Sequence, residues 1–236
     1  MSRGLGLTLL WALLAWTGLA GLPGAELRAL PLPDDVEVTG QVLYDSRGGA
    51  PARPAVVDIL KVYAHNPAYI FMRSKGWRET DPQGSPLFNA AKAAANKALA
   101  ETAQASRVNV ITVPGGVRGG AQPAPDLTQQ VIDRLPVYHV HGNVHVGRAA
   151  GAQRIAVVDT AAVLASIPTW QEAQALDDSD ARFHLLRGRY LEELNRVVNE
   201  VARRGGYDTI VEAGGVTSRL GPVPDLTSAA IGSVQR

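Results

Sequence analysis

The chain has 236 residues, no cysteine, and 23 Lys and Arg side chains against 22 Asp and Glu. That length allows one domain or two small ones. The formal net charge of +1 excludes a generally basic nucleic-acid-binding protein, because phosphate contacts require an excess of Lys and Arg. The absence of cysteine excludes a disulfide framework, a thiolate metal site and a cysteine nucleophile.

The N-terminus has the pattern of a signal peptide, which we assign to residues 1–20. Arg3 supplies a positive charge, an apolar run extends from Leu5 to Leu22, and Gly18-Leu19-Ala20 fits the small-x-small cleavage pattern. We therefore expect cleavage after Ala20 and a periplasmic or cell-envelope location. An uncleaved membrane anchor is the alternative, since about 18 apolar residues are just enough to span a bilayer.

The rest of the chain contains an internal repeat. Residues 96–135 align without gaps with residues 195–234 at an offset of 99, with 13 identities in 40 positions. Upstream, residues 55–58 match 156–159 at an offset of 101, and residues 38–42 resemble 140–144 at an offset of 102. Because the blocks keep their order, we infer a tandem duplication with units at 36–136 and 137–236.

Each unit is expected to begin with strands and to continue into helices. A β-branched run, 54–57 or 154–158, ends at Asp58 or Asp159, whose short carboxylate is typical of a helix N-cap. In the second unit an apolar stripe from Phe183 to Val201 predicts a long helix over 180–204, which Gly205-Gly206 ends.

In the first unit, Pro82, Gly84 and Pro86 are expected to shorten the corresponding helix to residues 87–105. A strand over 108–113 or 207–212 and a Gly-Gly turn follow in the two units. A short last helix, which Thr128 or Thr227 is expected to cap, completes each unit.

The second unit resembles the Skp/OmpH family of periplasmic chaperones over most of residues 154–236. The resemblance rests on four segments in order, and the first unit carries a weaker form of them: Ile155-Ala156-Val157-Val158-Asp159, Leu194 to Ala202 followed by Gly206-Tyr207-Asp208, Gly215-Val216, and Pro224-Asp225-Leu226-Thr227 with Ile231. It implies an α+β fold of two tandem Skp/OmpH-like units, each a small β body with a short helical hairpin arm. The arm of the first unit is expected to be degenerate.

The resemblance also implies a function. Members of this family form trimers and hold unfolded outer-membrane proteins with their arms, so we expect a homo-oligomer, with a trimer favoured, that binds unfolded envelope proteins as a holdase. Many weak contacts can supply affinity through avidity without catalytic groups. The alternative is a non-catalytic envelope scaffold or interaction module that keeps the body without chaperone activity. Exposed apolar side chains inside the hairpin over 171–204 would favour the chaperone, and a hairpin packed against the body would favour the scaffold.

A third hypothesis concerns three histidines. On a single strand over 137–146, His139, His141 and His145 would project from one face, a geometry that suits zinc or copper. A polar, solvated strand face is the simpler interpretation. It is favoured because the first unit has Glu37, Thr39 and Leu43 at the corresponding positions, and because no carboxylate follows nearby to complete the site.

No other motif indicates catalysis. Gly115-Gly116 lacks the spacing of a phosphate-binding loop and predicts a turn, and Asp126 and Asp225 are interpreted as turn or capping residues. We assign Asp177, Asp178 and Asp180 to the N-terminal end of the long helix. We expect Phe71, Trp77 and Trp170 in the core. The sequence therefore predicts no enzyme, with no catalytic, cofactor-binding or metal-binding residues and no nucleic-acid or small-molecule partner.

Overall fold

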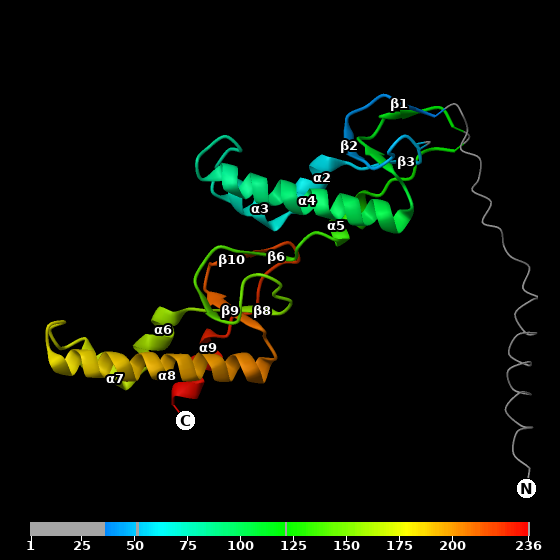
Figure 1. Ribbon diagram of the computed structural model, residues 1–236. Helices are drawn as coiled ribbons and strands as arrows, with labels where there is room; N and C mark the ends of the chain where they lie inside the picture. Colours follow the sequence, from blue (N-terminus) through cyan, green and yellow to red (C-terminus); the bar gives the residue numbers. More distant parts are fainter. Residues whose placement is uncertain (1–35, 51, 121, 236) are drawn as a thin grey trace, which may run out of the picture.

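The structure is a computed structural model that describes residues 36–50, 52–120 and 122–235 (Figure 1). The predicted signal peptide and its cleavage site lie outside these residues. No helix within the described ranges combines the length and the apolar character needed to cross a membrane. The fold is mixed α+β, as the sequence predicts.

Nine elements make up the first half of the described chain, and nine make up the second half in the same order. The first half contains β1 (Glu37–Val38), β2 (Val42–Asp45), β3 (Pro54–Val56), α2 (Ile59–Ala64), α3 (Pro67–Ser74), α4 (Gly84–Ser106), β4 (Val110–Thr112), β5 (Val117–Arg118) and α5 (Thr128–Asp133). The second half contains β6 (Tyr138–Val140), β7 (Val144–Val146), β8 (Ile155–Val158), α6 (Thr160–Ala165), α7 (Pro168–Ala173), α8 (Ala181–Gly205), β9 (Thr209–Glu212), β10 (Val216–Ser218) and α9 (Thr227–Val234).

Strand pairing is the same in the two halves. The three-stranded sheets have the orders β2-β4-β3 and β7-β9-β8, with the central strand antiparallel to the first neighbour and parallel to the second. The parallel pairs require a crossover, which the intervening helices provide. Two antiparallel ribbons, β1–β5 and β6–β10, lie beside these sheets. The internal sequence repeat therefore corresponds to a repeat in topology.

The long helices begin and end at residues with local reasons to do so. Asp58 and Asp159 accept backbone N–H groups as the N-caps of α2 and α6, and Asp180 does the same for α8, as the sequence predicts. Gly206 ends α8 in the left-handed conformation at φ 66°. The expected start of the first long helix at residue 87 is wrong, because α4 already begins at Gly84 and contains Pro86 in its first turn, where the proline disrupts no helical hydrogen bond.

A threonine near the end of each unit has a different role from the one expected. Leu127 and Leu226, rather than Thr128 and Thr227, occupy the N-cap positions of α5 and α9. The Thr227 hydroxyl donates to the Asp225 carboxylate over 2.6 Å and accepts the Asp159 backbone N–H over 2.9 Å. Thr128 makes the same two bonds in the first unit, at the same distances. Each threonine thus ties the last helix to the end of the parallel edge strand.

Each unit has its own hydrophobic core. In the second unit the predicted stripe of α8 is buried against α6, α7, α9 and the sheet, and its core-facing residues are Leu186, Tyr190, Leu194, Val197, Val198 and Val201. The first core is smaller in its side chains, since α4 contributes mainly alanines with Leu99. The expected core positions of Phe71 and Trp77 are wrong: both are half-buried and belong to neither core cluster. Trp170 is half-buried and packs against the second core.

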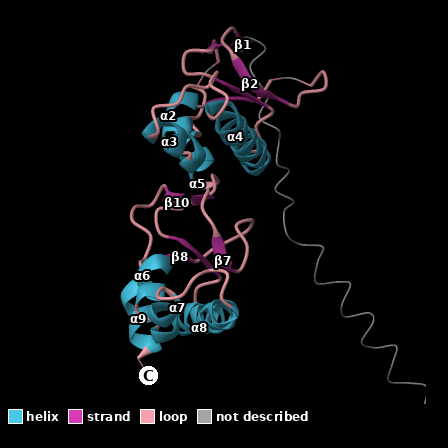
Figure 2. Ribbon diagram, turned by 90° about the vertical axis from the view of Figure 1, so that its left-hand side faces the viewer, coloured by secondary structure: helices cyan, strands magenta, loops and turns pink. Residues whose placement is uncertain are grey.

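The described parts of the two units meet mainly at helix α3, and Arg219 after β10 also donates to the Asp133 carbonyl of α5. Helix α3 of the first unit contacts both strands of the β6–β10 ribbon of the second. Figure 2 shows this ribbon between the two units, below the helices of the first. Figure 1 shows that the starts of α4 and α8, and the turns before them, point to the same side of the molecule.

The C-terminal ends of α4 and α8 offer a test of backbone strain. Arg107 occupies the position of Gly206 in the repeat and has φ 56°, the one positive value of a non-glycine residue among those described. A left-handed non-glycine residue costs about 1 to 2 kcal/mol, and the extra chain entropy of glycine offsets part of the gain. We expect Arg107→Gly to stabilise the protein by about 0.5 to 1 kcal/mol in urea unfolding. Gly206→Arg is the reciprocal control and is expected to destabilise it; equal stability of all three proteins would contradict this account.

The threonine bridge predicts a larger effect. Thr227→Val keeps the shape of the side chain but leaves the Asp159 N–H without its acceptor, and an unsatisfied buried group costs about 1 to 3 kcal/mol. We expect a loss of that size in the free energy of unfolding, measured by urea titration. Ser228→Ala removes an exposed hydroxyl one residue later and is expected to have little effect. A similar small effect for both variants would show that the bridge does not stabilise the unit.

Candidate functional site

The helical hairpin of the second unit consists of α7 and α8 and uses most of its apolar side chains internally. The Trp170 ring meets the Tyr190 ring edge to face at 4.9 Å between centroids. Leu176 and Phe183 pack against the same core from the turn and the start of α8. The inner face of this hairpin is therefore closed rather than open to solvent.

Two leucines of α8 remain outside this packing. Leu185 is 56% exposed and Leu191 is 39% exposed, and both belong to the outer half of the helix. Farther along, Arg196 pairs with Glu193 and Glu200, and Arg204 also pairs with Glu200. The N-terminal half of α8 thus exposes two leucines among charged side chains, whereas the C-terminal half exposes a network of paired charges.

The hairpin of the first unit, α3 and α4, carries an aromatic cluster in place of leucines. Tyr63, Tyr69 and Phe88 lie with ring centroids 5.6 to 6.4 Å apart, and all three are half-buried. Tyr69 and Phe88 are not among the residues that pack against either core. Burial, with smaller contributions from Glu79 and Tyr69, raises the pKa of Tyr63.

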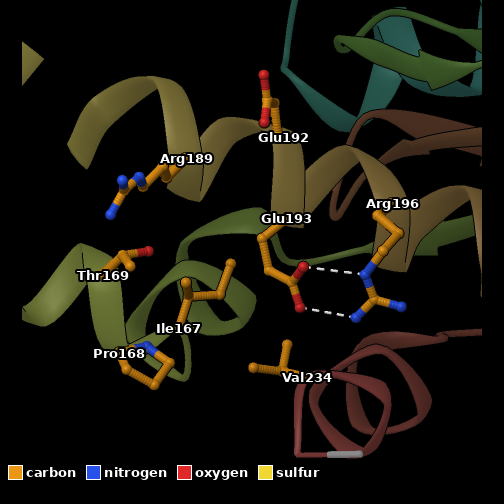
Figure 3. Close-up of a pocket in the computed structure, with 8 residues that line it drawn as sticks. All are labelled: Ile167, Pro168, Thr169, Arg189, Glu192, Glu193, Arg196 and Val234. Atoms are coloured by element: carbon orange, nitrogen blue, oxygen red, sulfur yellow. Dashed lines mark hydrogen bonds and ion pairs between the residues drawn. The ribbon is translucent and has the colours of Figure 1, made fainter. Parts of the chain in front are cut away.

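A groove of about 580 Å³ lies between α7, α8 and the end of α9 (Figure 3). Ile167, Pro168 and Val234 give it an apolar side, and Glu193 accepts two hydrogen bonds from Arg196, of 2.9 and 2.7 Å. These bonds lower the pKa of Glu193 and raise that of Arg196. Both groups are already neutralised by each other, and the groove contains no nucleophile beside a base.

The three histidines do not share a strand, so the expected geometry is wrong. His139 lies on β6 and His145 on β7, which belong to different sheets. The strand is interrupted between them at Gly142, which packs so closely on Gly215 that a Cβ would lie 2.5 Å from the Cα of Gly215. The repeat has the same close approach between Gly40 and Gly116, so this break is part of the fold.

His145 has a carboxylate partner that sequence reasoning missed. Its Nε2 lies 2.8 Å from the Glu212 carboxylate, which also accepts the hydroxyl and the backbone N–H of Thr160. The Glu212 carboxylate thus serves three groups: the Thr160 hydroxyl, the Thr160 backbone N–H and the His145 ring. It joins β7, β9 and the start of α6. No signal near His145 in the sequence indicates Glu212, since 67 residues separate them.

His139 and His141 instead face helix α3 at the contact between the units, which we call the joint. Phe71 stacks on His141 with 3.7 Å between ring centroids and an interplanar angle of 11°, and it lies 5.7 Å from the His139 ring. Trp77 meets Phe71 edge to face at 6.0 Å. The Nε2 atom of His139 is buried without a hydrogen-bond partner among the described residues.

The joint favours neutral histidines. Burial lowers the pKa of His139 and of His141, and for His141 the nearby His139 and Lys75 add to this effect. The charged groups that α3 and the end of β10 bring to this contact are Arg73, Lys75 and Arg219, and α3, β6 and β10 contain no Asp or Glu. A bound metal cation would meet the same positive surroundings.

Within the described ranges, no group of three or more His, Asp, Glu or Cys side chains is arranged to hold a metal ion. Asp126 and Asp225 lie in turns, where hydrogen bonds from Thr128 and Thr227 lower their pKa values. They therefore act as structural acceptors, as the sequence suggests. Asp177 accepts hydrogen bonds from Ser179, and Asp180 caps α8.

Comparisons with protein-family models, with curated proteins and with solved structures found no match for this chain. Its function is therefore argued from its own residues. The features that remain as candidates are the exposed apolar side chains of the hairpins and the aromatic joint.

The histidines predict a pH dependence. A lowered pKa means that the native state binds fewer protons than the unfolded state. The contribution of these two histidines to the free energy of unfolding is therefore fully present above pH 6.5 and is lost as the pH falls below it. We therefore expect the free energy of unfolding to decrease between pH 7.5 and 5.5, by a modest amount because both side chains are partly exposed. Urea unfolding at the two pH values measures it.

The matched variants isolate this contribution from the other titrating groups. Replacing both residues, His139→Gln with His141→Gln, is expected to reduce the difference in stability between the two pH values. His184→Gln changes an exposed histidine of α8 and is expected to leave the difference as it is. The assignment is wrong if the double variant and the parent protein lose the same stability on acidification.

Proposed function

We propose that this protein is an exported, non-catalytic binding protein of the cell envelope that acts as an OmpH-like holdase for unfolded envelope or outer-membrane proteins. The proposal rests on the Skp/OmpH resemblance of residues 154–236 and on the recurrence of a small sheet with a helical hairpin in each half of the chain. It includes an N-terminal signal for export to the periplasm and two tandem units with Skp/OmpH-like organisation.

The observation that carries the proposal is the apolar surface on both hairpins. Leu185 and Leu191 in the second unit are exposed, and Tyr69 and Phe88 in the first are half-buried outside both cores. The helices that carry them extend to the same side of the molecule (Figure 1). Apolar contacts are not directional, so such surfaces accept many unfolded sequences with low affinity each. Two surfaces on one chain bind a long client more tightly than either alone.

The proposal also includes assembly. We expect a homo-oligomer, with a trimer first, because several copies would place several hairpins around one client. The expected partners are unfolded proteins and further copies of this chain, and not nucleic acid or a small molecule. The balanced charge of the chain fits clients that are held by apolar contacts.

A second candidate is the envelope scaffold, and one observation favours it. The long apolar stripe of α8 is buried within its own unit, so that only two of its leucines are left for other proteins. A scaffold would use the rigid body and the ordered charges of α8 rather than loose apolar contacts. The two candidates differ in whether an unfolded client is protected.

Client protection distinguishes them. The protein without its first 20 residues is mixed with an unfolded β-barrel membrane protein during dilution from urea, and aggregation is followed by light scattering. We expect suppression at near-stoichiometric amounts. Leu185→Ser with Leu191→Ser is expected to raise the required amount several-fold, because these side chains make the contacts.

Leu220→Ser is the matched control, since Leu220 is 70% exposed but follows β10, outside the hairpins. This variant is expected to protect the client as well as the parent protein does. Absence of protection by the folded parent protein at large excess would reject the holdase and leave the scaffold. If the Leu185→Ser, Leu191→Ser double variant protects the client as well as the Leu220→Ser variant does, the client binds to a different surface.

A further inference from the structure

The joint between the units is built from two different surfaces. One is the face of α3 that carries Phe71, and the other is the β6–β10 ribbon with His139 and His141. A contact between unlike surfaces of repeated units is heterologous, and in general it can be continued by further units. The tandem duplication makes that possibility specific for this chain.

Each unit contains a copy of both surfaces. Helix α7 corresponds to α3 at an offset of 101, and the β1–β5 ribbon corresponds to β6–β10. The backbones agree in detail: Thr39 and His141 donate their N–H groups to the carbonyls of Gly116 and Gly215 over the same 2.9 Å. Within the described residues, the α7 face of the second unit and the β1–β5 ribbon of the first unit take no part in the joint. Their backbones would allow α7 of one copy to lie on the ribbon of the next.

The side chains of the α7 face and of the β1–β5 ribbon differ from those at the corresponding positions of the joint. Glu172 occupies the position of Phe71, and Glu37 and Thr39 occupy the positions of His139 and His141. All three are exposed. Glu37 lies opposite Arg118 across the ribbon, whereas His139 lies opposite the neutral Thr217. The ribbon that is covered is thus aromatic and neutral, and the ribbon that is free is charged.

We infer that the side chains of the α7 face and of the β1–β5 ribbon prevent this contact from forming between copies of the chain. The joint then forms once, between the two units of a single chain. A head-to-tail contact would remove Glu172, which pairs with Arg182 over 3.7 Å, and Glu37, which lies opposite Arg118, from water, and the lost hydration of these charges opposes it. Repeat proteins need polar ends for the same reason.

This inference is independent of the proposed function. It holds for a holdase and for a scaffold alike. It also limits how copies assemble: an oligomer of this protein does not use the contact of the α7 face of one copy with the β1–β5 ribbon of another.

The first experiment introduces the aromatic residues of the joint at the corresponding positions of the β1–β5 ribbon and of α7. The variant that combines Glu37→His, Thr39→His and Glu172→Phe is compared with the parent protein by light scattering after size exclusion, over a range of concentrations. We expect the mass of the variant to grow with concentration beyond that of the parent assembly. An unchanged mass at every concentration would overturn the inference.

The control variant makes similar chemical changes at exposed helix positions away from both surfaces. It combines Asn89→His, Gln104→His and Glu101→Phe, all at exposed positions of α4. Its mass is expected to equal that of the parent protein. Growth of both variants to the same extent would show that added aromatic surface alone causes association, which would also overturn the inference.

The second experiment introduces into the joint the glutamate that α7 carries at the position corresponding to Phe71. Phe71→Glu is expected to separate the two units, which raises the radius of gyration in X-ray scattering while helix content by circular dichroism is kept. Ala90→Glu, on an exposed position of α4, is the matched control and is expected to leave the radius unchanged. A Phe71→Glu protein with the parent's helix content and radius would show that the joint tolerates a carboxylate, and the inference would fail.

Discussion

In each unit one threonine hydroxyl joins three segments that are far apart in the chain. Thr128 and Thr227 donate to the aspartate two residues earlier and accept the backbone N–H of Asp58 or Asp159, which ends the parallel edge strand and caps the next helix. Beside this bond, Leu127 and Leu226 pair through their N–H groups with Val56 and Val157 of the same strand. The edge of each sheet is thereby closed, and the start of α2 or α6 and the last helix are held at one point.

That shared framework leaves the outer surfaces free to differ. The first unit has an alanine-rich α4 and an aromatic cluster on its hairpin, whereas the second has a leucine- and valine-rich α8 with ordered ion pairs. Only the second of the two has the Glu212 carboxylate between His145 and Thr160, since the first has Val113 in the place of Glu212. Duplication therefore preserved the bonds that define the unit, while residues that face solvent or the other unit diverged.

The features predicted well are those with a local cause. The spacing of Leu186, Tyr190 and Leu194 predicts α8, and the short carboxylates of Asp58 and Asp159 predict two helix starts, because helix periodicity and capping act within a few residues. The prediction failed where a distant segment decides. The strand expected over 137–146 is divided between two sheets, because Gly142 packs on Gly215 and the two ends pair with different strands.

The sequence by itself determined the repeat, the long helix of the second unit with its buried stripe, and the helix starts at Asp58 and Asp159, because all of these follow from short-range patterns and from comparison of the chain with itself. Only the tertiary structure decided which copy of each surface is covered. Phe71 lies on α3 and His141 directly after β6, and their counterparts in the repeat are Glu172 and Thr39. Nothing local in the sequence distinguishes the covered ribbon from its copy. Burial depends on what another part of the chain brings into contact, and that partner is set by the path of the whole chain.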